Sequence, residues 1–295
     1  MSNFVLSCCS TADLSKAHFE KRDISYICFH FSLNDQPYTD DLGQSIPFPQ
    51  FYQAMRDGAE TKTSQVNEEE YIAYFAGILE QGKDILHVCL SSGLSGSFNS
   101  ARLAKEELEK KYPDRKIYIV DSLGASSGFG LFMETLADLR DQGMDIDALY
   151  QWAMKNRLHM HLWFFSTDLS FFVKGGRISK TAGFLGTMLR LCPLMNMDHE
   201  GHLIPREKIR TKKKAVVSIV EKMKEHAQDG LRYSGKCFIS HSDCLEDAQA
   251  VAALVEESFP HLCGKVLIND IGTTIGSHTG PGTVALFFWG DERME

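Results

Sequence analysis

Short apolar runs of strand length alternate with amphipathic stretches of helical length through the first half of the chain. In the strand-like runs aliphatic and β-branched residues stand together, whereas in the helical stretches apolar residues recur every three or four positions. Such alternation is typical of a parallel sheet covered by helices on both faces. Strands are predicted over about Phe4–Leu6, Tyr26–Phe31, Ile85–Leu90 and Lys116–Val120. Helices are predicted after the capping-box-like pair Asn67 and Glu70, over about Ser97–Lys111, up to about Arg140, and over Asp145–Arg157. A loop is predicted over about Asn34–Pro49.

The second half of the chain has a different, mixed pattern. A hairpin is predicted around the turn His199-Glu200-Gly201, and the residues Gly276–Gly282 are predicted to form a constrained turn between two late strands. The remaining strands are predicted at Leu162–Phe165, Lys236–Ser240, Lys265–Asp270 and Thr283–Trp289, and the helices at Lys213–Ala227 and Leu245–Ser258. This mixture favours a second α/β domain with a mixed sheet. A chain of 295 residues exceeds the usual size of one domain. We therefore expect an N-terminal three-layer parallel-sheet domain, residues 1–157, and a C-terminal α/β domain, residues 158–295.

Composition narrows the functional classes. The net charge of −8 argues against nucleic acid, whose phosphates require a basic face. No apolar run approaches the roughly 20 residues of a membrane-spanning helix, and Met1–Phe4 lack the features of a signal peptide. The eight cysteines include no CxxC pair, which indicates reduced thiols. These features together lead us to expect a cytoplasmic protein. We expect no metal site, because the histidines around Glu200 lie in a predicted turn and lack metal-ligand spacing.

Glycine-rich polar turns that open helices are the main candidates for binding chemistry. The turn Ser91–Ser97 combines glycines with a helix N-terminus, which suits a phosphate or a carboxylate. The alternative is that the serines only cap the helix and that the turn binds no ligand. The hydroxyls of Thr63 and Ser64 precede another helix and could equally serve only as caps. His278 lies among glycines, so its imidazole could face a ligand or be structural.

Two further readings stay open from the residues alone. The string Gly93–Ser97 lacks the second glycine of a GxSxG elbow, but an acyl hydrolase that uses Ser95 with His278 remains the alternative function. The Walker pattern of an ATP-binding loop is absent. The apolar residues that follow Gly175-Gly176 could form ordinary core or one wall of an elongated apolar pocket.

Several strings, taken together and in order, resemble the DegV family of bacterial fatty-acid-binding proteins, the B components of fatty acid kinase. The strings are Thr63-Ser64-Gln65, Ser91–Ala101, Val120-Asp121-Ser122, Gly175–Ser179, Lys208–Thr211 and His278–Thr283. They span nearly the whole chain, and the ordered set is specific where a single string would be weak. The chain departs from the family at Val66-Asn67, where Pro-Ser is common.

The resemblance implies a two-domain DegV-like fold that holds one long-chain fatty acid, such as palmitate, stearate or oleate, and no cofactor. It places the carboxylate near the domain junction, hydrogen-bonded by Thr63, Ser95 and His278, and the tail in an apolar tunnel. Ser64, Gly96 and Thr279 are expected beside the carboxylate. Candidate residues of the acyl pocket are Phe164, Phe171, Phe184, Met188 and Leu191.

The resemblance also implies a carrier rather than an enzyme. A separate ATP-dependent fatty acid kinase would phosphorylate the bound carboxylate, and the acyl phosphate would pass to phospholipid synthesis. Arg177 and Arg210 are expected to contact this partner or the phosphate product. The basic run Lys208–Lys214 could contact the partner or, transiently, an anionic membrane surface, or could be a solvated charged face. The preferred chain length and the oligomeric state are not readable from the sequence.

Overall fold

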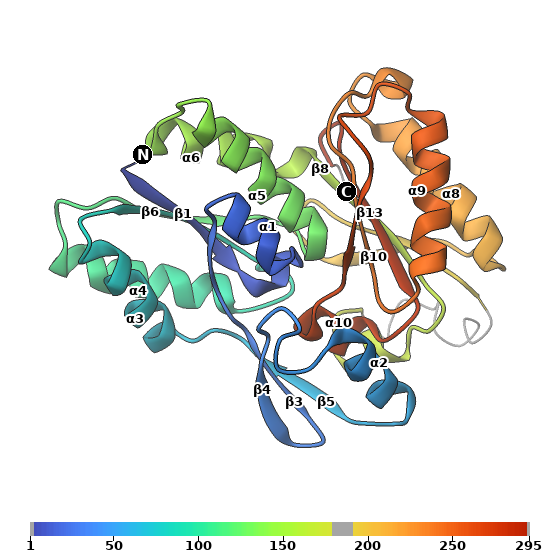
Figure 1. Cartoon of the computed structure of the whole chain (residues 1–295), viewed down its shortest axis with the longest axis horizontal. Helices are drawn as coiled ribbons and strands as arrows, with labels where there is room; N and C mark the ends of the chain where they lie inside the picture. Colours follow the sequence, from blue (N-terminus) through green and yellow to red (C-terminus); the bar gives the residue numbers. More distant parts are fainter. Residues whose placement is uncertain (1–2, 179–190, 294–295) are drawn as a thin grey trace.

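The N-terminal part is built on a four-stranded parallel sheet with the strand order β2-β1-β6-β7. The computed structural model describes residues 3–178 and 191–293. The strands are β1 (Phe4–Cys9), β2 (Ser25–Ile27), β6 (Asp84–Cys89) and β7 (Ile117–Asp121). The helices are α1 (Lys16–Lys21), α3 (Glu68–Leu79), α4 (Ser97–Lys111), α5 (Ser126–Asp141) and α6 (Ile146–Asn156). Helices α3 and α4 cover one face of the sheet, and α5 and α6 cover the other (Figure 1). The predicted three-layer parallel arrangement is confirmed.

Local capping explains where the helices of this part begin. The Asn67 side chain accepts a hydrogen bond from the Glu70 amide, and the Glu70 carboxylate accepts one from the Asn67 amide. This reciprocal capping box satisfies two amides that the first turn of α3 would otherwise leave unpaired. Asp145 caps α6 in a similar way by accepting from the Ala148 amide. These caps define where α3 and α6 begin, and the one at Asn67 and Glu70 was predicted from the sequence.

The C-terminal part contains a six-stranded mixed sheet with the order β10-β9-β8-β13-β11-β12. The strands are β8 (Met160–Ser166), β9 (Leu194–Met197), β10 (Leu203–Glu207), β11 (Phe238–His241), β12 (Leu267–Asp270) and β13 (Thr283–Trp289). Only the β11–β12 pair among these neighbours is parallel within the described residues. Helices α8 (Lys212–His226) and α9 (Leu245–Ser258) cover its outer face (Figure 1). The predicted mixed sheet is confirmed.

Side chains alternate across this sheet and divide it into two functional faces. Trp163 and Phe165 of β8 pack into the core beneath α8 and α9. Leu162 and Phe164 point the other way and join the core shared with the N-terminal sheet. This is the period-two alternation of a strand that is buried on both faces. The inner face of the C-terminal sheet is therefore available as a wall against the N-terminal part.

A small third sheet, β4-β3-β5, differs from the prediction. The segment expected as one strand, Tyr26–Phe31, divides between β2 and β3 (His30–Leu33), which lie in different sheets. The expected loop contains β4 (Gln36–Thr39) and leads into α2 (Phe48–Arg56); β5 (Thr61–Ser64) follows. Asn34 and Asp35 turn β3 into β4 with positive φ angles of 50° and 63°, as in a type I′ hairpin turn. An Asn-Asp pair between two polar strands was the signal for this hairpin.

The glycine-rich segment before β13 also differs from the prediction. Instead of one turn, it contains the helix α10 (Thr273–Thr279), and the turn follows at Gly280 and Gly282, whose φ angles are +65° and +90°. The third sheet and α2 pack against this helix. The Tyr52 hydroxyl of α2 donates to the carbonyl of Ile271 at 2.7 Å, just before α10. Residues of the N-terminal half therefore help to position α10.

Polar contacts join the two halves around this arrangement. Lys236 places its ammonium 2.6 Å from carboxylate oxygens of both Glu134 and Asp138 on α5. The Ser126 and Ser240 hydroxyls lie 2.9 Å apart.

The domain boundary between residues 157 and 158 stays a prediction, because one hydrophobic core contains residues of both halves. No helix within the described ranges has the length and apolar character needed to cross a bilayer.

Arg293 allows the strength of this junction to be tested. The side chain is 4% exposed and donates to the carbonyls of Leu123 at 2.7 Å and Asp198 at 3.1 Å. Arg293→Ala leaves these buried carbonyls without a charged donor, so we expect the free energy of unfolding to fall by about 3 kcal/mol in urea denaturation. The exposed Arg232 is the control, since Arg232→Ala should change stability by less than about 0.5 kcal/mol. Equal effects of the two variants would contradict this role.

Candidate functional site

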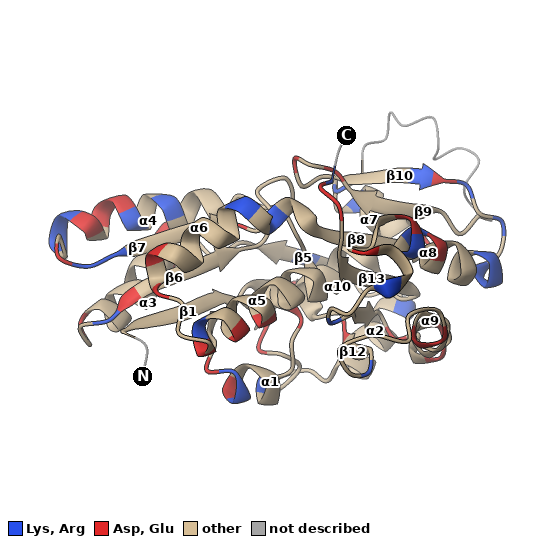
Figure 2. Ribbon diagram, turned by 90° about the horizontal axis from the view of Figure 1, so that it is seen from above, with Lys and Arg blue, Asp and Glu red and all other residues tan. Residues whose placement is uncertain are grey.

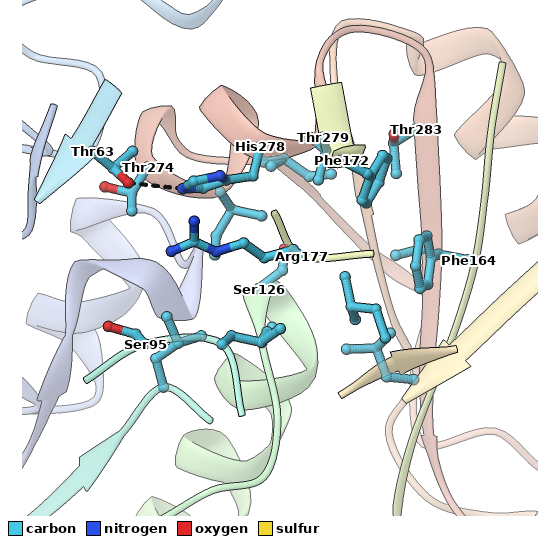
Figure 3. A pocket seen from close by; sticks show the side chains of 18 of the residues that line it. Thr63, Ser95, Ser126, Phe164, Phe172, Arg177, Thr274, His278, Thr279 and Thr283 are labelled. Carbon is cyan, nitrogen blue, oxygen red and sulfur yellow. Dashed lines mark hydrogen bonds between the residues drawn. The ribbon is translucent and has the colours of Figure 1, made fainter. Parts of the chain in front are cut away.

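A cavity lies between the N-terminal part and the inner face of the C-terminal sheet. The empty space between its lining atoms amounts to about 940 Å³, open solvent at its mouth included. One end is polar and the other apolar, with the aromatic rings of Phe164 and Phe172 on the apolar side (Figure 3). The polar lining residues include Thr63, Ser95, Arg177, Thr274 and His278. The apolar lining residues include Leu90, Leu162, Phe164, Phe172, Ala285 and Phe287. This arrangement suits an elongated apolar ligand with one polar head.

His278 is held at the polar end by the third sheet. Strand β5 presents Thr63, whose hydroxyl lies 2.7 Å from Nε2 of His278 (Figure 3). The other ring nitrogen, Nδ1, is buried without a hydrogen-bond partner among the described residues. Burial, and secondly the nearby Arg177, lowers the pKa of His278 to about 4. A neutral imidazole with one unused buried nitrogen is therefore present at neutral pH, ready to exchange hydrogen bonds with a ligand.

Arg177 supplies the positive charge of this end. Its guanidinium donates to the carbonyl of Gly175 at 2.5 Å and lies between His278 and Ser95 in Figure 3. Desolvation lowers the pKa of Arg177, which nevertheless stays charged at neutral pH. A Cβ at position 175 would collide with Nδ1 of His278, so glycine is required there for the close approach. The Gly175-Gly176 pair thus places a half-buried cation beside a neutral imidazole.

Ser95 reaches the cavity from the turn that opens α4. Its hydroxyl accepts a hydrogen bond from the Ser97 amide at 3.2 Å, and the Ser95 amide donates to the carbonyl of Ser91 at 3.1 Å. The turn is itself tied to the C-terminal half, because the Ser91 hydroxyl donates to the carbonyl of Gly201 at 2.8 Å. The Ser95 hydroxyl therefore satisfies the first amide of α4 from the turn before the N-cap Gly96, and Ser95 also lines the cavity.

The comparisons with known proteins identify the family of the chain. Residues 9–291 match the family model described as "Uncharacterised protein, DegV family". The chain belongs to the DegV family. It is 35% identical over 293 residues to a DegV domain-containing protein of Clostridium perfringens, with 99% of each chain covered. It is also 32% identical over 282 residues to a protein of Thermotoga maritima named "Fatty acid-binding protein", with 93% of each chain covered.

A solved structure extends the comparison to three dimensions. The DegV family protein from Thermus thermophilus, whose structure is described as "Fatty Acid Binding", superposes with a TM-score of 0.86 at 26% identity. The match covers 97% of this chain and 99% of that one. The fold expected from the resemblance, a DegV-like α/β fold with a parallel and a mixed sheet, is therefore confirmed.

The structure of this DegV protein brings together part of the expected carboxylate site. Thr63, Ser95, His278 and Thr279 all line the cavity. Ser64 is exposed and, as the strand neighbour of Thr63, projects to the other side of β5. Gly96 is exposed as well, and its Cβ position is occupied by the Gln65 side chain, so this glycine serves close packing beside the site.

The acyl-pocket residues are brought together less completely. Phe164 lines the cavity, and its ring stacks on Phe172 at a centroid distance of 5.6 Å. The expected neighbour Phe171 instead lies against Gly280, because successive residues of the helix α7 (Ser170–Lys174) point about 100° apart. Leu191 is half-buried against the core rather than in the described lining. Phe184 and Met188 lie outside the described residues.

The two expected partner-contact arginines are in different places. Arg177 lines the cavity, whereas Arg210 is exposed just before α8. Figure 2 shows the basic run as blue segments that lead from the end of β10 into α8. Lys212 in this run pairs with Asp247 of α9 at 2.9 Å. The structure thus places Arg210 on the surface and Arg177 in the cavity lining, and their expected partner contacts stay predictions.

Sequence reasoning missed several lining residues. Thr274 lies in the first turn of α10, ahead of the expected turn Gly276–Gly282, and Ser126 opens α5 with a positive φ of 53°. Ala285 and Phe287 were predicted to lie in a strand, but the sequence did not show which face of the sheet their side chains occupy. Their signal was the alternation of β13, which becomes informative only once its neighbour β8 is known.

The geometry disfavours the hydrolase alternative. A nucleophilic serine needs a histidine base within hydrogen-bond reach and an acid that orients this histidine. Here Nε2 of His278 is paired with Thr63, and Nδ1 has no partner among the described residues, so no described carboxylate orients the ring. The Ser95 hydroxyl accepts from a backbone amide. The described residues therefore do not assemble a Ser-His-acid triad at Ser95.

The lowered pKa of His278 gives a prediction with a defined sign. The pKa of about 4 lies below the value of about 6.5 expected in the unfolded chain. As the pH falls from about 6.5 to 4, the unfolded chain takes up this proton first, so His278 makes the fold less stable in that window. Arg177→Gln removes a positive neighbour and should raise the pKa of His278, while burial keeps it below 6.5.

The titration can be followed directly by NMR of 13C-labelled histidine Cε1 groups. His278 should stay neutral to about pH 4 in the unaltered protein and titrate at a higher pH in Arg177→Gln. The exposed Arg206 on β10 provides the control variant Arg206→Gln, which should leave the titration unchanged. A midpoint near 6.5 in the unaltered protein would contradict the burial of the ring.

Proposed function

We propose that this DegV protein binds one long-chain fatty acid, with the carboxylate at the polar end of the cavity and the tail along the inner face of the C-terminal sheet. The main support for the proposal is that one cavity has both a polar end and an apolar end. A buried imidazole nitrogen without a partner lies beside a cation at one end, and aromatic and aliphatic side chains line the other end. The relatives named for fatty-acid binding support the same ligand class.

The head group fits the hydrogen-bonding groups at this end. While the ring of His278 is neutral and paired with Thr63, this pair has one proton left to donate to a carboxylate, from either the Thr63 hydroxyl or Nδ1 of His278, and the Ser95 hydroxyl can donate a second. Such charge-assisted bonds are stronger than neutral ones. Arg177 offsets part of the cost of bringing an anion out of water. Because this cation also bonds to the Gly175 carbonyl, the carboxylate need not be locked into a two-pronged ion pair. A head group held mainly by neutral donors stays available for reaction.

The tail would supply most of the affinity. A sixteen-carbon chain buries roughly 14 methylenes, worth about 11 kcal/mol at ~0.8 kcal/mol each before the cost of association. Head-group hydrogen bonds contribute far less, about 1–3 kcal/mol each. The polar end therefore orients the ligand, and the apolar wall retains it.

We further propose that the bound carboxylate is presented to a separate ATP-dependent kinase in the cytoplasm. The motif resemblance supports this step, since it includes both arginine-containing strings around Arg177 and Arg210. The chemistry of the site is consistent with it: the described site lacks an assembled nucleophile and base of its own, so activation of the carboxylate calls for a partner. The resulting acyl phosphate would serve phospholipid synthesis.

Denaturing extraction and mass spectrometry of the released small molecules test the ligand. About one equivalent of fatty acid per chain is expected in the unaltered protein. Thr63→Ala and His278→Ala remove head-group partners and should lower the retained lipid several-fold, because each lost bond costs about 1–2 kcal/mol. Ser64→Ala is the matched variant on the other side of β5, and it should retain lipid as the unaltered protein does. An extract without fatty acid, or equal loss in Ser64→Ala, would contradict the proposed head-group site.

Ser95→Ala separates a carrier from a hydrolase. A carrier should keep part of its lipid, with a loss no larger than that of Thr63→Ala because the tail still binds, but should lose ligand phosphorylation by the partner kinase and ATP. A hydrolase should instead lose turnover of a chromogenic acyl ester. Both assays are run on the unaltered protein and on Ser95→Ala. Ester turnover by the unaltered protein that disappears in the variant would overturn the carrier function.

A further inference from the structure

Two histidines and an aspartate converge on the side of the C-terminal sheet that faces away from the cavity. His161 lies at the start of β8, His226 is the last residue of α8, and Asp291 follows β13. Nε2 of His161 is 2.9 Å from Oδ1 of Asp291, and Nδ1 of His226 is 3.3 Å from Oδ2. One potential ligand atom from each of the three residues lies within 4.8 Å of the other two. Three segments distant in sequence thus direct donor atoms to one point.

The spacing is close to that of a metal site. Zinc bonds to imidazole nitrogen and carboxylate oxygen at about 2.0–2.2 Å, so ligand atoms in a tetrahedral site stand roughly 3.3 Å apart. The His226–Asp291 separation of 3.3 Å matches this value, and the His161–Asp291 separation of 2.9 Å is somewhat shorter. Imidazole and carboxylate together suit zinc, nickel or cobalt better than magnesium or calcium, which prefer oxygen ligands alone.

The two rings are held in place before any ion arrives. The His161 ring stacks on Phe288 at 5.2 Å and on His226 at 5.1 Å, and His226 stacks in turn on Trp163 at 5.7 Å. Such a ring stack limits rotation of both imidazoles, so little conformational entropy is lost on binding. The Asp291 side chain is 60% exposed while His161 is 5% exposed, so an ion can enter from solvent on one side only.

The group is separate from the proposed fatty-acid cavity. His161 and Trp163 lie on the outer face of β8, whereas Leu162 and Phe164 line the cavity on the inner face. The other histidine–carboxylate group among the described residues, Asp198, Glu200 and His202, is different. There Oδ1 of Asp198 already accepts from the amides of Glu200 and His202 and serves the hairpin turn.

We propose that His161, His226 and Asp291 form a site for one divalent transition-metal ion of the zinc class, which would tie the ends of β8, α8 and β13 together. In the ion-free state Nε2 of His161 also lies 2.9 Å from the carbonyl of Asp291, as a donor would. Coordination through Nε2 requires that proton to move to Nδ1, which changes the tautomer of the neutral ring and not its charge. Solvent and the Asp291 carbonyl remain to complete the coordination.

The test uses the untagged full-length protein after treatment with a chelator. Isothermal titration with ZnCl2 should give one ion per chain, and CoCl2 should give the visible absorption bands of a protein-bound ion. His226→Ala and Asp291→Asn, both at partly exposed positions, should each weaken binding at least tenfold. His202→Ala is the matched control and should bind zinc as the unaltered protein does.

Each other outcome decides against the site. Absence of zinc binding by the unaltered protein, or unchanged affinity in both His226→Ala and Asp291→Asn, would overturn the proposal. Loss of binding in His202→Ala alone would assign the ion to the hairpin turn instead. Thermal unfolding gives a second readout: zinc should raise the Tm of the unaltered protein and of His202→Ala but not of His226→Ala. Retained fatty acid should be the same in all variants, so failure here leaves the lipid function untouched.

Discussion

The pairing register of β8 with β13 is the constraint on which the rest of the structure depends. The two strands pair antiparallel from Met160 opposite Trp289 to Ser166 opposite Thr283. Because side chains alternate, this register places Phe164 and Ala285 on the inner face and Trp163 and Leu286 on the outer face. A slip of one residue in either strand would exchange its two sets. The cavity wall, the packing of α8 and α9, and the convergence of His161 with Asp291 all follow from one alignment.

A second constraint acts on α10, the helix that carries His278. At its start the Thr273 hydroxyl donates to the buried carboxylate of Asp40 at 3.0 Å, and the Ser10 hydroxyl donates to the same carboxylate at 3.1 Å. Burial raises the pKa of Asp40, and hydrogen bonds from hydroxyl donors such as these oppose that rise. The third sheet holds the other side of the helix through Thr63. The position of the imidazole is thus set by residues from three distant parts of the chain.

How far the sequence could predict this structure depended on how local each signal was. The capping box at Asn67 and the apolar runs of the parallel sheet act within a few residues, so these elements were predicted correctly. The third sheet has short, half-exposed strands whose stability comes from packing on α10, and that contact joins residues more than 200 positions apart. The Asn34-Asp35 turn and the alternation of β3, His30-Phe31-Ser32-Leu33, were visible in the sequence, but the partner strand Gln36–Thr39 has no clear alternation.

The polar residues of the candidate site could be predicted from local motifs, but the residues of its apolar wall could not, because their orientation depends on packing. Ordered motifs identified Thr63, Ser95 and His278, and the structure brings all three to one cavity. Which of two adjacent phenylalanines lines that cavity depends on the rotation of a five-residue helix, which no periodicity can fix over so short a length.

The polar end has a consequence for how a ligand would be both held and used. Two lysines or arginines around a buried carboxylate would stabilise the carboxylate most. The same two cations would also neutralise the oxygen that reacts in the proposed phosphorylation. Here the imidazole is neutral and a single guanidinium shares its donors with the Gly175 carbonyl. Orientation then comes from hydrogen bonds and retention from the apolar wall. Because these tasks are divided between opposite ends of one cavity, a reactive head group is compatible with tight binding of the chain.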